Sequence, residues 1–140
     1  MDLSSINPAL LLASLIVAST PILLAALGEL VVERAGVLNL GVEGMMITGA
    51  ICGFAFAVNS GSPVVGFLMA AIGGAGLAFL FALLTQFSLA NQVASGLALT
   101  LFGLGLSALF GQSYIGIKPP PTLPINFGPI SDIPFIGKVV

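Results

Sequence analysis

Four long apolar runs, separated by short clusters of glycine, proline and polar residues, set the pattern of this 140-residue chain. The runs cover about residues 8–28, 38–58, 64–87 and 93–111. Each is close to the roughly 20 residues that an α-helix needs to cross a bilayer. None shows the alternation of apolar and polar residues that is typical of membrane β-strands. Because backbone in hydrocarbon must satisfy its own hydrogen bonds, the pattern predicts an all-α, polytopic transmembrane helix bundle of about four spans.

The breakers between the runs refine this picture. Pro8 suits a first helical turn, and Pro21 is expected to kink the first span. The second span begins within "VLNLGVEGMM", so we expect it to be broken by glycine. After Gly111 the chain becomes rich in proline, which favours extended backbone. We therefore treat residues 1–140 as a single transmembrane domain in which residues 112–140 form a proline-rich interfacial or aqueous loop.

Composition supports the membrane class and excludes several others. Hydrophobic residues make up 58% of the chain and charged residues 6%, and no Asp, Glu, Lys or Arg occurs from Gly44 to Ile117. A soluble domain carries about a quarter charged residues. The N-terminus lacks a basic signal-peptide region, so the first run is expected to remain as a span. With no histidine, one cysteine and no phosphate-binding glycine loop, the sequence favours no enzyme, no metal and no bound cofactor, and nothing indicates a nucleic-acid partner.

Small residues recur on one side of the predicted helices. They let membrane helices approach closely, so we interpret them as packing faces, with a pore lining as the alternative. The helix-packing candidates are Gly49, Gly53, Gly66, Ala70, Gly74, Ala78, Gly96 and Gly103.

The segment "ERAGVLNLGVEG", residues 33–44, concentrates charge in a chain that otherwise avoids it. Its glycines interrupt the helix that would be needed to cross, each at a cost of about 1 kcal/mol relative to alanine. Asn39 and Glu43 are four apart, which on a helix places them on one face. Interrupted segments with polar groups tend to line a cavity; an interfacial loop is the alternative. Charges at the end of a span usually lie at the headgroups, which is how we interpret Glu29, Glu33 and Arg34.

Two adjacent amides, Asn91 and Gln92, lie between the third and fourth spans. An asparagine at a helix start satisfies otherwise unpaired backbone donors, so these residues suit a cap or a plain turn. Facing the transport path is the functional alternative.

Three blocks, "TPILLAALGELVVERAGVLNLGVEGMMITGA", "LANQVASGLALTLFGLGLSALFG" and "KPPPTLP", resemble the permease subunit of bacterial ABC importers for nucleosides and simple sugars. These permeases share a superfamily with the branched-chain amino acid and ribose permeases. The resemblance implies that this chain is the N-terminal portion of a longer, multi-pass protein of the bacterial plasma (inner) membrane. It also implies a second permease subunit, a cytoplasmic ABC ATPase that binds the ATP, and a substrate-binding lipoprotein as partners.

The resemblance places the family's glycine-rich block and its second block on the substrate-path candidates Asn39, Gly41, Glu43, Gly44, Asn91 and Gln92. Family members often carry basic residues before the second block, where this chain has "LTQFSLA". The resemblance favours an extracytoplasmic tail. The count of Lys and Arg, one in the loop at Arg34 and two in the tail, instead favours a cytoplasmic tail by one residue.

Two other classes of protein fit the same length and span count. One is a small four-helix proton-coupled exporter with Glu29 or Glu43 as its membrane carboxylate. The other is a membrane scaffold or non-transporting fragment in which the small-residue faces serve only assembly. Proton release on adding substrate favours the exporter over the permease, and an in-frame continuation of the gene with further spans would show that the chain is truncated.

Overall fold

The computed structural model describes residues 7–122. Residues 29–122 form one compact unit, and residues 7–28 belong to a second unit, described by itself. The helices are α1 (Pro8–Arg34), α2 (Val42–Ser60), α3 (Pro63–Ala82) and α4 (Gln92–Gly111), with short turns η2 (Leu83–Phe87) and η3 (Gln112–Tyr114). Over the described residues the expected all-α class is confirmed: four helical segments are long and apolar enough to cross a membrane.

Helix α1 continues beyond the end that its glycine predicts. It contains Pro21 and runs through Gly28 to Arg34. The expected first span, about residues 8–28, lies within this helix, which continues past Gly28 because one glycine costs a helix interior only about 1 kcal/mol. The apolar residues on both sides of Gly28 keep the helix long enough to span.

A different glycine ends α1. Gly36 has φ +83°, in the left-handed region that suits glycine. Its N–H donates to the carbonyl of Glu33 at 2.9 Å, and the N–H of Val37 donates to the carbonyl of Val32 at 3.2 Å. These two bonds make a Schellman motif, which satisfies the last carbonyls of the helix. The chain therefore leaves α1 in a fixed direction.

Helix α2 begins at Val42, later than the sequence pattern indicates. Asn39 lies in the loop before the helix, whereas Glu43 lies in the first helical turn. The expectation that the two share one helical face is therefore wrong. The reason is local: Gly41, with φ −90° and ψ 1°, occupies the cap position and is not helical.

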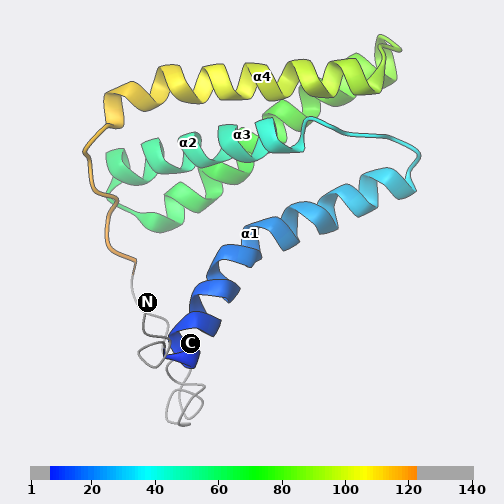
Figure 1. Cartoon of the computed structure of the whole chain (residues 1–140). Helices are drawn as coiled ribbons and strands as arrows, with labels where there is room; N and C mark the ends of the chain where they lie inside the picture. The colour runs from blue at the N-terminus through cyan, green and yellow to red at the C-terminus, as the bar shows by residue number, and fades with distance from the viewer. Residues whose placement is uncertain (1–6, 123–140) are drawn as a thin grey trace. The chain divides into compact units, whose positions relative to one another are not determined.

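Helix α2 is the centre of the larger unit and packs against both α3 and α4, which meet each other only weakly (Figure 1). Glycines make both contacts close. A Cβ on Gly53 would lie 2.8 Å from the Cβ of Ala70, and one on Gly66 would lie 2.6 Å from the Cβ of Ala57. Such contacts leave no room for a side chain, so α2 and α3 approach backbone to backbone.

The contact between α2 and α4 is as close and is made by backbone atoms. A Cβ on Gly44 would lie 2.6 Å from the carbonyl oxygen of Leu99, and one on Gly103 would lie 2.6 Å from the carbonyl oxygen of Gly44. The N-terminal half of α2 is thus pressed against α4. This contact fixes the loop that precedes α2.

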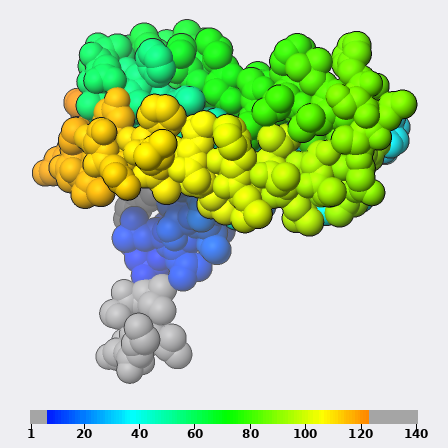
Figure 2. All heavy atoms as spheres, turned by 90° about the horizontal axis from the view of Figure 1, so that it is seen from above, coloured from blue at the N-terminus to red at the C-terminus, as the bar shows by residue number. Residues whose placement is uncertain are grey.

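Few large apolar side chains are buried. The core cluster is Met45, Leu77, Phe81 and Leu99, with Ala78 partly buried against it. The outer face of α4, turned towards the viewer in Figure 2, is covered by no other described helix. It exposes large apolar residues such as Leu101 and Leu109. An exposed apolar surface of this extent is expected of a protein that is solvated by lipid or by further helices.

The connection from α3 to α4 is irregular. The π-helical turn η2 is followed by Leu89, which has φ +51°. Within η2, Thr85 is buried and its hydroxyl donates to the carbonyl of Phe81 at 2.9 Å. After η3 the chain runs without helix from Ile115 to Thr122. The predicted proline-rich loop of residues 112–140 therefore begins with one 3-10 turn, and its part from residue 123 on lies outside the described residues.

Candidate functional site

The loop of residues 37–41, between α1 and α2, contains the predicted path residues Asn39 and Gly41 and is contacted by Gln92. Its backbone makes no regular helix, so its polar groups need other partners. Side chains from α1, from α4 and from the loop itself supply them. We call these residues, Glu29, Asn39, Gln92 and Thr100, the loop clasp.

Glu29 supports the loop from α1. Its Oε1 accepts a hydrogen bond from the backbone N–H of Asn39 at 3.1 Å. Its Oε2 is buried and has no hydrogen-bond partner among the described residues. Glu29 as a whole is half-buried, and leaving a buried carboxylate oxygen without a partner costs free energy. Glu29 therefore has a definite structural partner and is more than a charge at the end of a span.

Gln92 supports the loop from the start of α4. Its Oε1 accepts from the backbone N–H of Leu38 at 2.7 Å, across 54 residues of sequence. Its neighbour Asn91 faces its own helix: Asn91 Oδ1 accepts from the N–H of Ala94 at 3.0 Å. This is an N-cap, which satisfies one of the unpaired donors at the start of α4. The two adjacent amides therefore make different contacts.

Thr100, one turn further along α4 than Gly96, donates from its hydroxyl to the carbonyl of Leu40 at 3.0 Å.

Asn39 belongs to the loop itself and bonds within it. Its Oδ1 accepts from the N–H of Gly41 at 2.9 Å, and its Nδ2 contacts the Sδ of Met45 at 3.5 Å. With 7% of its surface exposed, Asn39 is buried. Its side chain is oriented into the protein.

Two glycines let the loop approach α4. A Cβ on Gly96 would lie 2.9 Å from the backbone nitrogens of both Leu40 and Gly41. A Cβ on Gly41 would lie 3.1 Å from the Oδ1 of Asn39. Any larger residue at either position would push the loop away from α4 and lengthen the hydrogen bonds of the clasp.

The other charged residues near the loop lie outside the clasp. Glu43, in the first turn of α2, is exposed, and so are Glu33 and Arg34 in the last turn of α1. A carboxylate in a first turn and a cation in a last turn both suit the helix dipole. Glu43 is thus the charged residue among the predicted path residues near the loop, and its carboxylate is exposed.

The remaining candidates lie in the helix contacts. Gly49 and Gly53 of α2 face Ala70 and Gly66 of α3, and Gly74 lies near the carbonyl of Met45. The sequence did not single out Thr100 as a site residue or Glu29 as a partner of the loop. Thr100 belongs to the small-residue face that includes Gly96 and Gly103, which is the signal that could have found it.

Together, the fold and the clasp define a helical membrane protein whose second span is entered through a bonded, non-helical loop. The chain belongs to the family described as branched-chain amino acid transport system / permease component, whose model matches residues 11–128.

Curated relatives agree with this assignment. The chain is 42% identical over 132 residues to TsgC13 of Haloferax volcanii, a permease protein whose name links it to glucose ABC transport, covering 91% of this chain and 40% of that protein. It is 30% identical over 150 residues to the guanosine ABC transporter permease protein NupQ of Bacillus subtilis, covering 99% of this chain and 47% of that protein. It is also 30% identical over 141 residues to the nucleoside ABC transporter permease protein NupC of Lactococcus lactis, covering 93% of this chain and 44% of that protein.

The chain therefore spans less than half of the length of these relatives. No solved structure matches it.

Proposed function

We propose that the chain is part of the transmembrane permease of an ATP-driven ABC importer and helps to form the translocation path for nucleosides or simple sugars. In this proposal a second permease subunit completes the path. A cytoplasmic ABC ATPase binds the ATP, so the chain needs no ATPase site or cofactor of its own. A substrate-binding lipoprotein delivers the solute to a complex in the bacterial plasma membrane. The names of the relatives, which include glucose, guanosine and nucleoside transporters, support this substrate range.

The observation that carries the proposal is the loop clasp. Non-helical backbone is tolerated at membrane depth only where it is packed in protein or lines a water-filled cavity. Here the N–H groups of Leu38, Asn39 and Gly41 and the carbonyl of Leu40 all have partners. Transporters use interrupted helices, whose unwound backbone is hydrogen-bonded to the protein, to place polar groups beside a solute.

The geometry favours different roles for the path candidates. Asn39 and Gly41 are buried and bonded within the loop, and Gln92 binds Leu38, which favours support of the loop for these three. Gly44 packs against α4, and Asn91 serves α4 as a cap. Glu43 is exposed beside the break, so we propose Glu43 as the residue that meets the solute. A carboxylate accepts hydrogen bonds from sugar hydroxyls, which nucleosides and simple sugars both carry.

Uptake by cells that carry the complete transporter tests this proposal. Labelled guanosine and labelled glucose are supplied to wild type and to the Glu43→Leu and Glu33→Leu variants. Losing one hydrogen bond to the solute lowers uptake of the transported solute by about five- to tenfold in Glu43→Leu. Glu33→Leu, which removes an exposed carboxylate outside the path, retains it. Equal uptake by both variants at equal expression would remove Glu43 from the path, and no uptake of either solute by wild type would contradict the substrate range.

The proton-coupled exporter is tested on the same protein. Purified transporter in weakly buffered solution releases protons on adding substrate if a membrane carboxylate exchanges a proton for the solute. An ATP-driven importer releases none at this step.

A further inference from the structure

The connection from α3 to α4 departs twice from regular geometry. Its first turn, η2, is π-helical, which is rare in proteins and frequent at functional sites. Leu89 then has φ +51°, whereas the other positive φ values among the described residues belong to the glycines Gly36, Gly61 and Gly116. This conformation is strained for a residue with a Cβ. The side chain of Leu89 is 84% exposed, so its own packing does not compensate for the strain.

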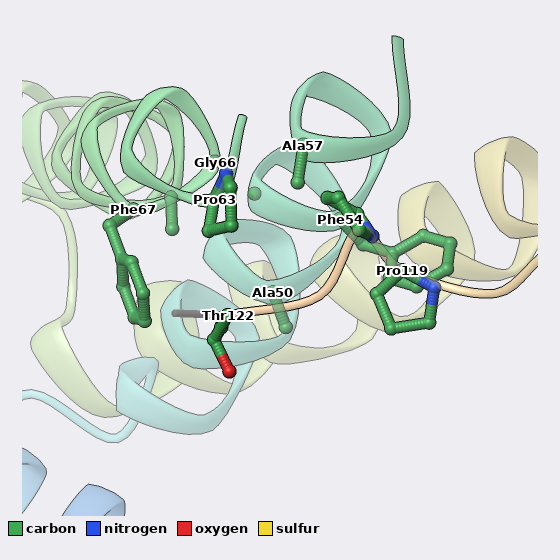
Figure 3. Close-up of a pocket in the computed structure, with 11 residues that line it drawn as sticks. Ala50, Phe54, Ala57, Pro63, Gly66, Phe67, Pro119 and Thr122 are labelled. Atoms are coloured by element: carbon green, nitrogen blue, oxygen red, sulfur yellow. The ribbon is translucent and has the colours of Figure 1, made fainter. Parts of the chain in front are cut away.

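The opposite end of α3 is regular. The turn from α2 to α3 has a glycine at its left-handed position, Gly61, with φ +67°, and α3 begins with Pro63. Glycine after a helix and proline at the start of a helix both suit these positions. Figure 3 shows this end of α3, where Gly66 lies against Ala57 of α2. The strain is therefore local to the connection between α3 and α4.

The end of α1 provides a measure of this departure, because it also ends in a left-handed residue. There the N–H of the residue after Gly36 bonds to the carbonyl five residues earlier, as in the Schellman motif. After Leu89, the N–H of Ala90 bonds to the carbonyl of Leu84, six residues earlier, at 3.0 Å. The π-helical turn therefore holds one residue more than a regular ending.

A buried hydroxyl supports this wide turn. Thr85 lies inside η2 with 5% of its surface exposed, and its hydroxyl donates to the carbonyl of Phe81 at 2.9 Å. A threonine that bonds to a carbonyl one turn earlier adds a hydrogen bond where the backbone bonds are irregular, and such bonds often accompany a bend. Thr85 is thus a side chain that stabilises the turn from within.

The turn is connected to the loop clasp in two ways. Leu84 of η2 packs against the core cluster, and Val37, the first residue of the loop, packs against the same cluster. In addition, residues 88–91 alone separate η2 from Gln92, whose Oε1 accepts from the N–H of Leu38 at 2.7 Å. The geometry of the turn therefore determines where Gln92 lies.

We propose that residues 83–89 form a conformational switch with two states. In the first, the turn is π-helical, Leu89 is left-handed and Gln92 holds Leu38. In the second, Leu89 leaves the left-handed region, the turn becomes α-helical and Gln92 releases Leu38. Loss of the extra residue turns the chain after it by about 100° and moves it by about 1.5 Å, which breaks a hydrogen bond. The inference concerns this movement and does not depend on the transported solute.

The rest of the clasp stays in place in both states. A Cβ on Gly96 would lie 2.9 Å from the backbone nitrogen of Leu40, and one on Gly103 would lie 2.6 Å from the carbonyl oxygen of Gly44. These contacts hold α4 against the loop and α2, so the movement is confined to residues 84–92. The bonds that Glu29 and Thr100 make to the loop persist. Strained backbone of this kind is found in switch regions, where it brings two states close in free energy.

Amide hydrogen exchange, measured at single residues of the purified full-length protein, tests the switch. Leu89→Gly removes the strain of the first state and slows exchange at Leu38 by about fivefold. Leu89→Val puts a β-branched residue in the left-handed region and speeds exchange at Leu38 by about fivefold. Exchange at Asn39, whose N–H is held by Glu29, is unchanged in both variants. Because Leu89 is exposed, neither substitution removes a buried contact.

A second pair of variants tests the turn itself. Thr85→Val keeps the shape of the side chain but removes its hydroxyl, and it speeds exchange at Leu38 by about fivefold. Thr85→Ser keeps the hydroxyl and has a smaller effect. Leu101→Val, on the exposed face of α4, leaves exchange at Leu38 unchanged and is the control.

The opposite responses to glycine and valine at residue 89 distinguish a switch from general loosening of the fold. If both Leu89 variants speed exchange at Leu38, or if neither changes it, the switch is wrong. Exchange that rises equally at Leu38 and Asn39 also overturns it. The Leu89 pair decides the matter even if Thr85→Val does not fold.

Discussion

The carboxylate of Glu29, near the end of α1, accepts a hydrogen bond from the backbone N–H of Asn39 at 3.1 Å. The two residues are ten apart in sequence, on either side of the turn at Gly36. This contact closes the loop back onto the helix that precedes it, while Gln92 and Thr100 hold it from α4. The entrance to the second span is therefore a bonded structure to which α1 and α4 both contribute side chains.

Removing the Glu29 carboxylate is expected to loosen this loop. Glu29→Leu leaves the Asn39 N–H without a partner and costs about 1–3 kcal/mol in the free energy of unfolding. Glu29→Gln keeps an acceptor and costs less than Glu29→Leu. Equilibrium unfolding of the purified protein in sodium dodecyl sulfate measures both. Glu33→Leu, an exposed glutamate one turn later, is the matched control and changes stability little; equal losses for Glu29→Leu and Glu33→Leu contradict the contact.

The glycine contact between α2 and α4 is expected to be intolerant of a methyl group. A Cβ at Gly103 would lie 2.6 Å from the carbonyl oxygen of Gly44, so Gly103→Ala forces the helices apart and destabilises the protein by about 1–3 kcal/mol. Gly105 lies on the same helix and a Cβ there would meet nothing within 4 Å. Gly105→Ala is therefore neutral or stabilising, by up to about 1 kcal/mol. The same unfolding assay compares the two variants. An equal free energy of unfolding for Gly103→Ala and Gly105→Ala would show that α2 and α4 do not meet closely at Gly103.

The local features of the fold could be predicted from the sequence. Hydropathy alone predicted four spanning helices, since each run is long enough to cross a bilayer without charge. The helix ends were predicted less well. The sequence does not distinguish Gly28 from Gly36, because both are glycines. In the structure Gly36 has a positive φ and Gly28 does not, and the conformation at Gly36 depends on the hydrogen bonds of the turn.

The pairing within the site could not be predicted because it is long-range. Gln92 and Thr100 lie 54 and 60 residues from the loop atoms that they bind. No periodicity reports such a pairing, so Asn39 and Glu43 looked equivalent in sequence, four apart on a presumed helix. Their burial differs because the cap at Gly41 separates them. The π-helical turn η2 likewise has no signal in its sequence, "LLTQF".

The two adjacent amides are expected to respond differently to substitution. Asn91→Ala removes the cap of α4 and costs about 0.5–2 kcal/mol, whereas Asn91→Ser retains a capping oxygen and most of the stability. Gln92→Leu leaves α4 capped but removes the partner of Leu38 N–H. Amide hydrogen exchange distinguishes them: Gln92→Leu speeds exchange at Leu38, and Asn91→Ala speeds it at Ala94. Exchange that rises at the same amide in both variants is the contrary result.

The turn that ends α1 is expected to require glycine. Gly36→Ala places a Cβ in the left-handed region and costs about 1–2 kcal/mol. Gly28→Ala, in the interior of the same helix with nothing within 4 Å of its Cβ, is expected to be neutral or to stabilise by up to about 1 kcal/mol. Thermal unfolding of the two variants gives the comparison. If Gly36→Ala is as stable as Gly28→Ala, the Schellman turn is not required.

The most direct measurement of the central claim, a loop clasped inside the protein beside an open Glu43, is the reactivity of single cysteines placed at residues 39 and 43. Cys52→Ala removes the native thiol, and a small hydrophilic maleimide that crosses membranes labels the protein before and after denaturation. Glu43→Cys is expected to label rapidly in the native state, and Asn39→Cys is expected to label only after denaturation. Rapid native labelling at residue 39, with residue 43 protected, would contradict it.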